Sequence, residues 1–306
     1  MTYEEKLYQL ATENENIVVM TAENRAAIRG LPQKLGNRFI DVGIAEQTMV
    51  GAAAGLALRG RIPIIHALAT FLTLRAFEFI RTDVGIANLP VKIVGGVPGF
   101  LSDGNGPTHQ AIEDISLMRG IPNMQVFCPA DEEDLVSGLP EIMKSPAPCY
   151  IRYNAMKPAV SHEKGFEIGK AEVLSTGNDI AILTYGFLLR EAVEAKAVLE
   201  SEGLSVRLVN LRMLKPIDEA AVLKAALETR LLVTLEDHFL TGGLFSIVAE
   251  LLVQQPMKVN LLPFALKEKW FKPALLQDVL QHEGFTGKQI AERILAHVRD
   301  VKYSVL

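Results

Sequence analysis

Short apolar runs alternate with longer segments of helical periodicity along most of this chain. The runs are rich in valine, isoleucine and leucine, which is typical of strands buried on both faces of a sheet. Strands are expected at residues 17–20, 39–44, 62–68, 91–97, 124–128, 149–153, 179–184, 205–210, 230–235 and 259–262. Helices are expected at residues 3–13, 46–58, 70–86, 113–119, 131–144, 187–202, 218–229, 243–254 and 286–301. The alternation predicts an α/β fold with largely parallel sheets and helices on both faces.

The alternation breaks once, between Asn154 and Gly169. This segment has mixed charges, Pro158 and two glycines but no clear period, which indicates a domain boundary. A chain of 306 residues has room for about two domains of roughly 100–200 residues each. We therefore expect two consecutive doubly wound α/β domains, one over residues 1–160 and a smaller one over residues 170–306.

Composition excludes several classes of protein. The formal net charge is −5 and no basic block occurs, which argues against nucleic-acid binding. No run of about 18 apolar residues predicts a membrane span, and the N-terminus lacks the pattern of a signal peptide, so we expect a cytoplasmic protein. Cys128 and Cys149 lie in strand-like runs without metal-ligand spacing, so we expect core thiols and no metal site. A mean hydropathy of +0.21 indicates that some apolar surface is buried against another subunit.

A carboxylate interrupts the most apolar helix of the first domain. Glu46 is the one acidic residue between Val42 and Ala57, and it follows a short apolar strand. One interpretation is an N-terminal helix carboxylate that makes a local cap, because backbone N–H groups are unpaired there. The other is an acid held in a dry pocket, where it shares a proton with a ligand. The pattern of this segment alone favours the cap.

Three further features lie at strand ends or in loops, where open α/β sheets bind ligands. Phe71 and Phe77 have the spacing of core residues but could also stack on a flat heterocycle. His109 lies in a loop rich in glycine and proline, where a structural and a catalytic role are equally plausible. Arg152 ends a strand and suits a phosphate or carboxylate, or an ordinary ion pair. His66 lies within a strand and is more typical of a satisfied core residue. There is no Walker loop and no GxGxxG after a strand.

Taken together, several motifs resemble the thiamine diphosphate-dependent enzymes of the transketolase family. The motifs are DVGIAEQ, ATF, DGNGPTHQAIEDISLMRGIPNMQVFCPAD and IRYN in the first domain, followed by GNDIAILTYG, VRLVNLRMLKPID and LEDHFLTGGLFSIVAELL. The resemblance runs over the whole chain, and GPTHQ with the following IEDI is its most specific part. It implies a pyrimidine-binding domain followed by the smaller transketolase C-terminal domain.

The resemblance implies a role for each residue near the expected cofactor. Glu46 matches the acid that binds a ring nitrogen of the aminopyrimidine and helps to form the nucleophilic ylid. Phe71 matches the aromatic side chain that packs on the pyrimidine, with Arg75 and Phe77 in support, and Ile44 belongs to the same cofactor-binding set.

The expected substrate contacts come from the loop and from strand ends. His109 matches the loop histidine that contacts hydroxyl groups of the donor sugar and helps proton transfer. Arg152 matches the arginine that binds the phosphate of the acceptor. Asp103, Asn105 and His66 complete the predicted substrate-binding set. Many relatives have an aspartate where this chain has Asn105, a neutral donor and acceptor, so a modified or branched sugar phosphate is a plausible substrate.

No motif of the diphosphate-binding domain occurs in the sequence. The resemblance therefore implies the C-terminal half of a split transketolase, with Mg²⁺ or Ca²⁺ held mainly by an N-terminal partner subunit in a heterotetramer (α2β2). Such an enzyme transfers a two-carbon ketol unit between sugar phosphates. The rival interpretations are a subunit similar to 1-deoxyxylulose-5-phosphate synthase, one similar to the β subunit of a 2-oxoacid dehydrogenase, and a non-catalytic assembly subunit.

Overall fold

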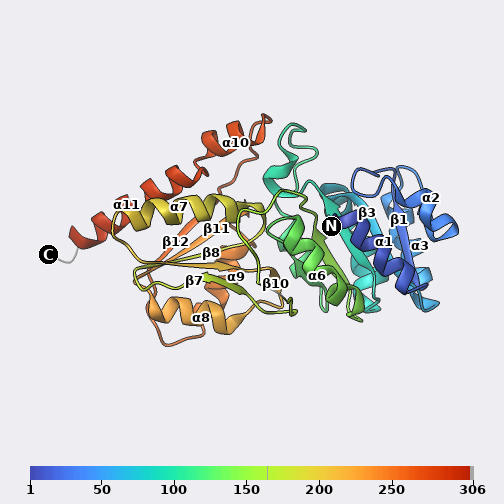
Figure 1. The fold of residues 1–306 in the computed structure, drawn as a ribbon, viewed down its shortest axis with the longest axis horizontal. Coiled ribbons are helices and arrows are strands. Elements are labelled where there is room, and N and C mark those ends of the chain that lie inside the picture. Colours follow the sequence, from blue (N-terminus) through green and yellow to red (C-terminus); the bar gives the residue numbers. More distant parts are fainter. Residues whose placement is uncertain (164, 304–306) are drawn as a thin grey trace.

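The computed structural model describes residues 1–163 and 165–303. Two α/β domains, each built on one sheet, lie side by side along the long axis of the molecule (Figure 1). Helices cover both faces of each sheet, so the predicted fold class is confirmed.

The first sheet has seven strands in the order β10-β5-β6-β4-β3-β1-β2. Its strands are β1 (Ile17–Thr21), β2 (Phe39–Asp41), β3 (Ile62–Leu68), β4 (Lys92–Gly96), β5 (Gln125–Phe127), β6 (Cys149–Arg152) and β10 (Met213–Lys215). All pairs are parallel except β10 with β5. The chain passes from β1 to β2 on one side and then to β3 on the other. The carboxyl ends of β1 and β3 therefore form a topological switch point, where such sheets bind ligands.

Two sets of helices cover this sheet. One face packs against α1 (Tyr3–Glu13), α2 (Leu31–Leu35) and α6 (Glu132–Lys144). The other packs against α3 (Glu46–Leu58), α5 (Asp114–Arg119) and an irregular helix over residues 71–86. Both α1 and α6 begin at a side-chain cap, since the Thr2 hydroxyl accepts from Glu5 N–H and Asp131 accepts from Asp134 N–H.

The second sheet has five strands in the order β12-β11-β8-β9-β7. Its elements are β7 (Glu172–Ser175), β8 (Ile180–Thr184), α7 (Leu189–Ser201), β9 (Val206–Asn210), α8 (Glu219–Glu228), β11 (Leu231–Phe239), α9 (Leu244–Leu252), β12 (Leu261–Leu266), α10 (Leu276–Glu283) and α11 (Gly287–Tyr303). Helices α7 and α11 pack together on one face, and α8 and α9 cover the other (Figure 1). The hydrophobic core of the α8–α9 face continues into that of the first domain, so the two domains share a dry interface.

Several elements differ from the sequence-based expectation. The helix expected over residues 70–86 forms two π-helical segments, η2 (Phe71–Arg75) and η3 (Ile80–Ile86), on either side of the single turn α4 (Phe77–Phe79). Such π segments often occur at functional sites. The helices α2 and α10 and the strands β7 and β10 were not expected. In the sequence, strand β10 follows the first three strands of the second domain, but it pairs with β5 in the sheet of the first domain.

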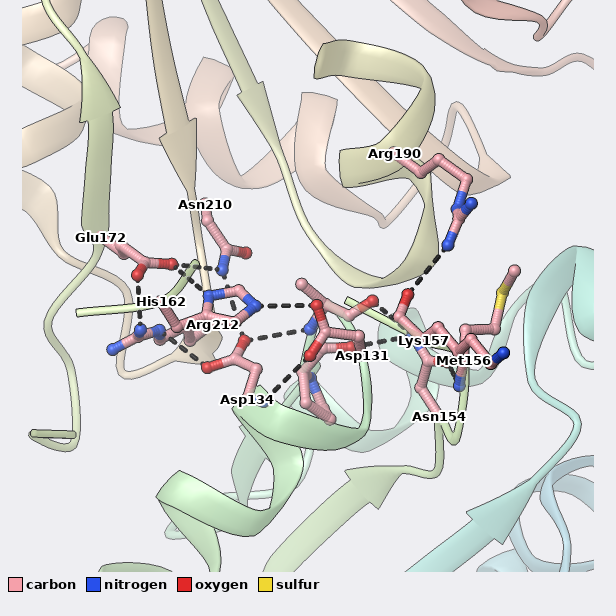
Figure 2. A network of polar contacts seen from close by, with 12 residues as sticks. Asp131, Asp134, Asn154, Met156, Lys157, His162, Glu172, Arg190, Asn210 and Arg212 are labelled. Atoms are coloured by element: carbon pink, nitrogen blue, oxygen red, sulfur yellow. Dashed lines mark hydrogen bonds and ion pairs between the residues drawn. The ribbon is translucent and has the colours of Figure 1, made fainter. Parts of the chain in front are cut away.

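A network of buried charges ties the segment between β6 and β7 to both domains (Figure 2). The two ring nitrogens of His162 lie 2.7 Å from Asp131 Oδ2 and 2.8 Å from Glu172 Oε2. Arg212 completes the network, because its guanidinium lies 2.9 Å from both Asp134 and Glu172. Burial alone would lower the pKa of His162, but hydrogen bonds to the two carboxylates raise it to about 10. His162 is therefore an imidazolium at neutral pH, and the network fixes one domain against the other.

Among the described residues, no helix has both the length and the apolar content that crossing a bilayer requires.

Candidate functional site

A cleft of about 470 Å³ opens at the carboxyl edge of the first sheet. Its lining comes from the segments that follow three neighbouring strands, β1, β2 and β3. The lining residues are Ala22, Glu23, Asn24, Arg25, Ala26, Arg29, Ile44, Glu46, Leu68 and Phe71. The cleft therefore lies at the switch point between β1 and β3, and it combines apolar walls with a few charged groups.

Glu46 places a buried carboxylate in this cleft. It begins α3 and is only 2% exposed. Its Oε2 accepts a hydrogen bond of 3.0 Å from Nη1 of Arg75, whose side chain is 41% exposed. Within the described residues, its hydrogen bond goes to this guanidinium and not to backbone N–H groups of the first helical turn. The local cap that the pattern favoured is therefore not observed, and the carboxylate faces the cleft.

Phe71 forms one wall of the cleft. The Arg75 guanidinium carbon lies 4.0 Å from the centroid of the Phe71 ring, a cation–π contact. The ring of His109 meets Phe71 edge-on, with centroids 5.2 Å apart. Phe77 does not line the cleft and packs instead on the core between the sheet and α3.

His109 is half-buried at the end of the loop that follows η4 (Gly99–Ser102). Its Nδ1 lies 2.9 Å from the Thr108 hydroxyl, and its backbone N–H donates to the Gly106 carbonyl. The second domain holds this loop in place. Gln110 Nε2 donates to the carbonyl of Phe271 at 2.9 Å, and the backbone N–H of Ala274 donates to the carbonyl of Asp103 at 3.1 Å.

The other loop residues lie further from the cleft. The Asp103 carboxylate accepts from the backbone N–H of Gly104, and Asn105 is exposed. The structure thus links Glu46, Phe71 and His109 through Arg75 in one chain of contacts, whereas Asp103 and Asn105 do not line the cleft.

Arg152 is buried between the two domains. It is 3% exposed, and its Nε and Nη1 lie 2.8 Å from Asp114 Oδ2 and 2.6 Å from Asp237 Oδ1. Asp237 belongs to the second domain and covers the end of β6. Gly99 permits this close approach, because its φ is +56° and a side chain there would overlap Asp237. With its guanidinium paired to two buried carboxylates, Arg152 joins the domains, and its role towards a substrate phosphate stays a prediction.

His66 is also removed from the expected substrate contacts. It is 4% exposed, and its Nε2 and Nδ1 lie 2.8 Å from the Tyr3 hydroxyl and 3.1 Å from the Met20 carbonyl. Burial lowers the pKa of His66 to about 4, so the ring is neutral at pH 7. Both ring nitrogens are satisfied within the core, which is the structural role that a histidine within a strand suggested.

The loop after β1 contributes cleft residues that the sequence-based reasoning missed. Asn24, Arg25 and Arg29 line the cleft together with Phe71. Arg25 is fixed by Asp41, whose Oδ2 lies 2.8 Å from Arg25 Nε. Arg29 is exposed and has no ion-pair partner among the described residues. The one available signal was position, because a polar loop follows a central strand at this edge.

Comparison with known protein families gives two matches that together cover most of the chain. The pyrimidine-binding domain of transketolase matches residues 1–158, and the transketolase C-terminal domain matches residues 169–290.

Several known proteins are similar over nearly the whole chain. A 6-deoxy-6-sulfo-D-fructose transketolase subunit, SqwH, from Clostridium sp. (strain MSTE9) is 36% identical and is matched over 94% of this chain and 91% of its own length. A putative transketolase C-terminal section from Methanocaldococcus jannaschii is 33% identical, with 97% and 95% covered. A 1-deoxy-D-xylulose-5-phosphate synthase from Dictyoglomus thermophilum is 36% identical over 97% of this chain, but the chain spans only 48% of that protein.

A solved structure described as a split-gene transketolase, inactive β4 tetramer, superposes with a TM-score of 0.87. It is 34% identical, and the match covers 96% of each chain. A transketolase from Pichia stipitis in complex with sedoheptulose 7-phosphate has the same fold, with a TM-score of 0.80 at 20% identity, and the match covers 99% of this chain and 46% of that one.

Proposed function

The chain belongs to the transketolase family, and we propose that it is the C-terminal subunit of a two-subunit, thiamine diphosphate-dependent transketolase. The observation that carries this proposal is the buried Glu46 carboxylate in an open cleft whose wall is Phe71. The reaction that we assign is transfer of a two-carbon ketol unit from a ketose phosphate to an aldose acceptor.

The residues of the cleft fit the aminopyrimidine end of thiamine diphosphate. This ring is flat and has a hydrogen-bonding edge, which matches an aromatic wall beside a buried carboxylate. Phe71 would pack on the ring face, with Ile44 and Leu68 on the apolar lining, and Glu46 would hold a proton at a ring nitrogen. When bound, the cofactor supplies the electron sink for cleavage of a carbon–carbon bond.

Arg75 supports both groups that hold the ring. Its ion pair with Glu46 fixes the position of the carboxylate, and its contact with Phe71 fixes the ring. We assign the exchange of a proton with a donor hydroxyl group to His109, whose ring contacts Phe71. This division gives Glu46 and His109 the catalytic roles and gives Arg75 a positioning role.

The partner that we propose is an N-terminal transketolase subunit, which would bind the diphosphate through Mg²⁺ or Ca²⁺. Relatives described as a transketolase subunit and as a split-gene transketolase match this chain over more than nine-tenths of their own length, which supports a divided enzyme. Among the described residues, no group of three or more histidine, cysteine, aspartate or glutamate side chains is arranged to hold a metal ion.

An unpaired apolar surface supports assembly with other subunits. Helix α3 has no charged residue between Gln47 and Leu58, yet Thr48, Ala52 and Gly55 on its outer face are exposed. Large apolar side chains on the neighbouring irregular helix are exposed as well, namely Leu74 at 44%, Phe79 at 40% and Ile86 at 71%. A helix that is apolar on all sides is normally buried on all sides. We assign this surface to subunit contacts in the proposed α2β2 enzyme.

Reconstitution tests the proposed function. The chain is purified alone and together with a co-encoded N-terminal transketolase subunit, and ketol transfer is measured with thiamine diphosphate and Mg²⁺. We expect activity only in the mixture. Ketol transfer by the lone chain would contradict the need for a partner, and a mixture that assembles but stays inert would contradict the enzymatic role.

A panel of donors separates the proposed reaction from its closest rival. The similarity to 1-deoxy-D-xylulose-5-phosphate synthases makes pyruvate decarboxylation the alternative activity. The panel therefore contains pyruvate, unmodified ketose phosphates and 6-deoxy-6-sulfo-D-fructose, the sugar named for the SqwH relative. We expect turnover of a ketose and not of pyruvate, and release of carbon dioxide from pyruvate would favour the alternative.

A further inference from the structure

A second cleft, of about 650 Å³, lies in the second domain. It opens at the carboxyl edge of β11 and β12, and its lining comes from the two segments that follow these strands. The lining residues are Phe239, Leu240, Thr241, Leu266, Lys267, Glu268, Lys269 and Trp270. None of them lines the Glu46 cleft. The volume is within the range of small-molecule sites, and the carboxyl edge of parallel strands is where α/β domains bind ligands.

The cleft has an aromatic wall. Trp270 is the single tryptophan of the chain and is 54% exposed. Its ring meets the half-buried Phe239 edge-on, with centroids 6.1 Å apart and an interplanar angle of 80°. Trp270 lines the cleft and more than half of its surface is exposed, so its ring is accessible from the cleft. An exposed indole face offers a flat ligand substantial stacking area.

The same wall carries one lysine without an ion pair among the described residues. Two lysines and one glutamate of the segment after β12 line the cleft, namely Lys267, Glu268 and Lys269. Lys269 is held by Glu283, whose Oε2 lies 2.6 Å from its Nζ. Lys267 is exposed and makes no ion pair within the part of the chain that the structure describes. Its ammonium group is therefore free to bind an anion at the cleft.

Polar groups next to the aromatic wall complete the cleft. The Thr241 hydroxyl makes no hydrogen bond within the described residues, and it can donate to an anionic oxygen. The one lining carboxylate, Glu268, lies between the two lysines in the sequence. An open aromatic face beside a free ammonium and a free hydroxyl is complementary to a ring that bears a negatively charged group.

We propose that the cleft between Thr241 and Trp270 binds a flat aromatic anion, with its ring on Trp270 and its charged group on Lys267. This site is separate from the proposed cofactor cleft and does not depend on the proposed function. It adjoins the segment that holds the His109 loop, since Phe271 accepts from Gln110 and Ala274 donates to Asp103.

Tryptophan fluorescence tests the proposal directly, because Trp270 is the only tryptophan and reports on this cleft alone. The purified full chain is titrated with AMP, which combines a flat ring with a phosphate, and separately with adenosine and with inorganic phosphate. We expect saturable quenching by AMP and weaker binding of each half-probe. Lys267→Ala should weaken AMP binding by about tenfold, the loss expected for one charge-assisted hydrogen bond.

A neighbouring lysine provides the matched control. Lys272 is exposed in the same segment but does not line the cleft, so Lys272→Ala should bind AMP like the unmodified chain. The absence of saturable quenching, or equal weakening in the two variants, would overturn the proposal. The titration is repeated with the N-terminal subunit bound, using the Trp270→Phe complex as the background. Loss of the AMP response there would identify the cleft as a subunit contact and would also overturn the proposal.

Discussion

Replacing Arg152 with methionine separates a structural role of this guanidinium from a ligand-binding one. Asp114 is 0% and Asp237 1% exposed, and both carboxylates are paired with Arg152. Without the guanidinium, two buried negative charges face each other across the domain interface. Burial already raises the pKa of Asp237 against the opposing effect of Arg152. Removing one partner of a buried ion pair costs about 3–5 kcal/mol.

Urea unfolding measures this loss. With a slope of about 3 kcal/mol per molar urea, the upper end for small proteins, the midpoint should fall by about 1–1.7 M. The triple variant Arg152→Met, Asp114→Asn, Asp237→Asn should recover much of the stability, because it leaves no buried charge unpaired. An exposed control is Arg230→Met, whose side chain is 83% exposed and whose loss should cost less than about 1 kcal/mol.

The refuting result for Arg152 is specific. Two results together would show that the guanidinium binds substrate. The free energy of unfolding of Arg152→Met would lie within about 1 kcal/mol of that of the unmodified chain, and the variant would raise KM for a phosphorylated sugar in the reconstituted enzyme. The interdomain role described here would then be wrong.

Three further perturbations follow from the contacts. His162→Gln should flatten the pH dependence of stability. Hydrogen bonds to Asp131 and Glu172 raise the pKa of His162 to about 10, so the protonated ring stabilises the fold fully below about pH 6.5 and this contribution is lost as the pH rises towards 10. Urea midpoints at several pH values measure the effect, and a pH dependence equal to that of the unmodified chain would contradict it. Ala52→Arg should block assembly, since it places a charge on the apolar face of α3, and light scattering that still detects the full assembly would count against that surface. Asn105→Asp should shift relative kcat/KM across a panel of ketose donors, and identical ratios would exclude Asn105 as a specificity residue.

The alternation of strands and helices was enough to predict the fold class, but not the elements that depend on contacts between domains. Strand β10 has only three residues, Met213–Lys215, and its pairing partners Val126 and Phe127 lie in the other domain. No local pattern encodes such a pairing. The π-helical segments around Phe71 were likewise hidden, because hydrophobic periodicity does not specify the hydrogen-bond register within a helix.

The candidate site was predictable where one residue contrasts with its own neighbours. Glu46 stands out as a lone acid in an apolar helix, and the structure places it in a cleft. For Arg152 the sequence left an anionic ligand and an ion pair open, because it does not reveal that Asp237 covers this strand-end arginine. Arg25 and Arg29 were missed because only the position of their loop, and no motif, connects them to the cleft.

The role of Glu46 is the most direct test of the proposed function. Glu46→Gln keeps the size of the side chain but cannot exchange a proton, so ketol transfer by the reconstituted enzyme should fall by at least about 100-fold. The matched control is Glu133→Gln, an exposed carboxylate in the first turn of α6, which should leave the rate unchanged. Assembly of both variants with the N-terminal subunit is verified by light scattering. An assembled Glu46→Gln enzyme that retains activity within about tenfold of the unmodified enzyme would contradict the proposed function of this cleft.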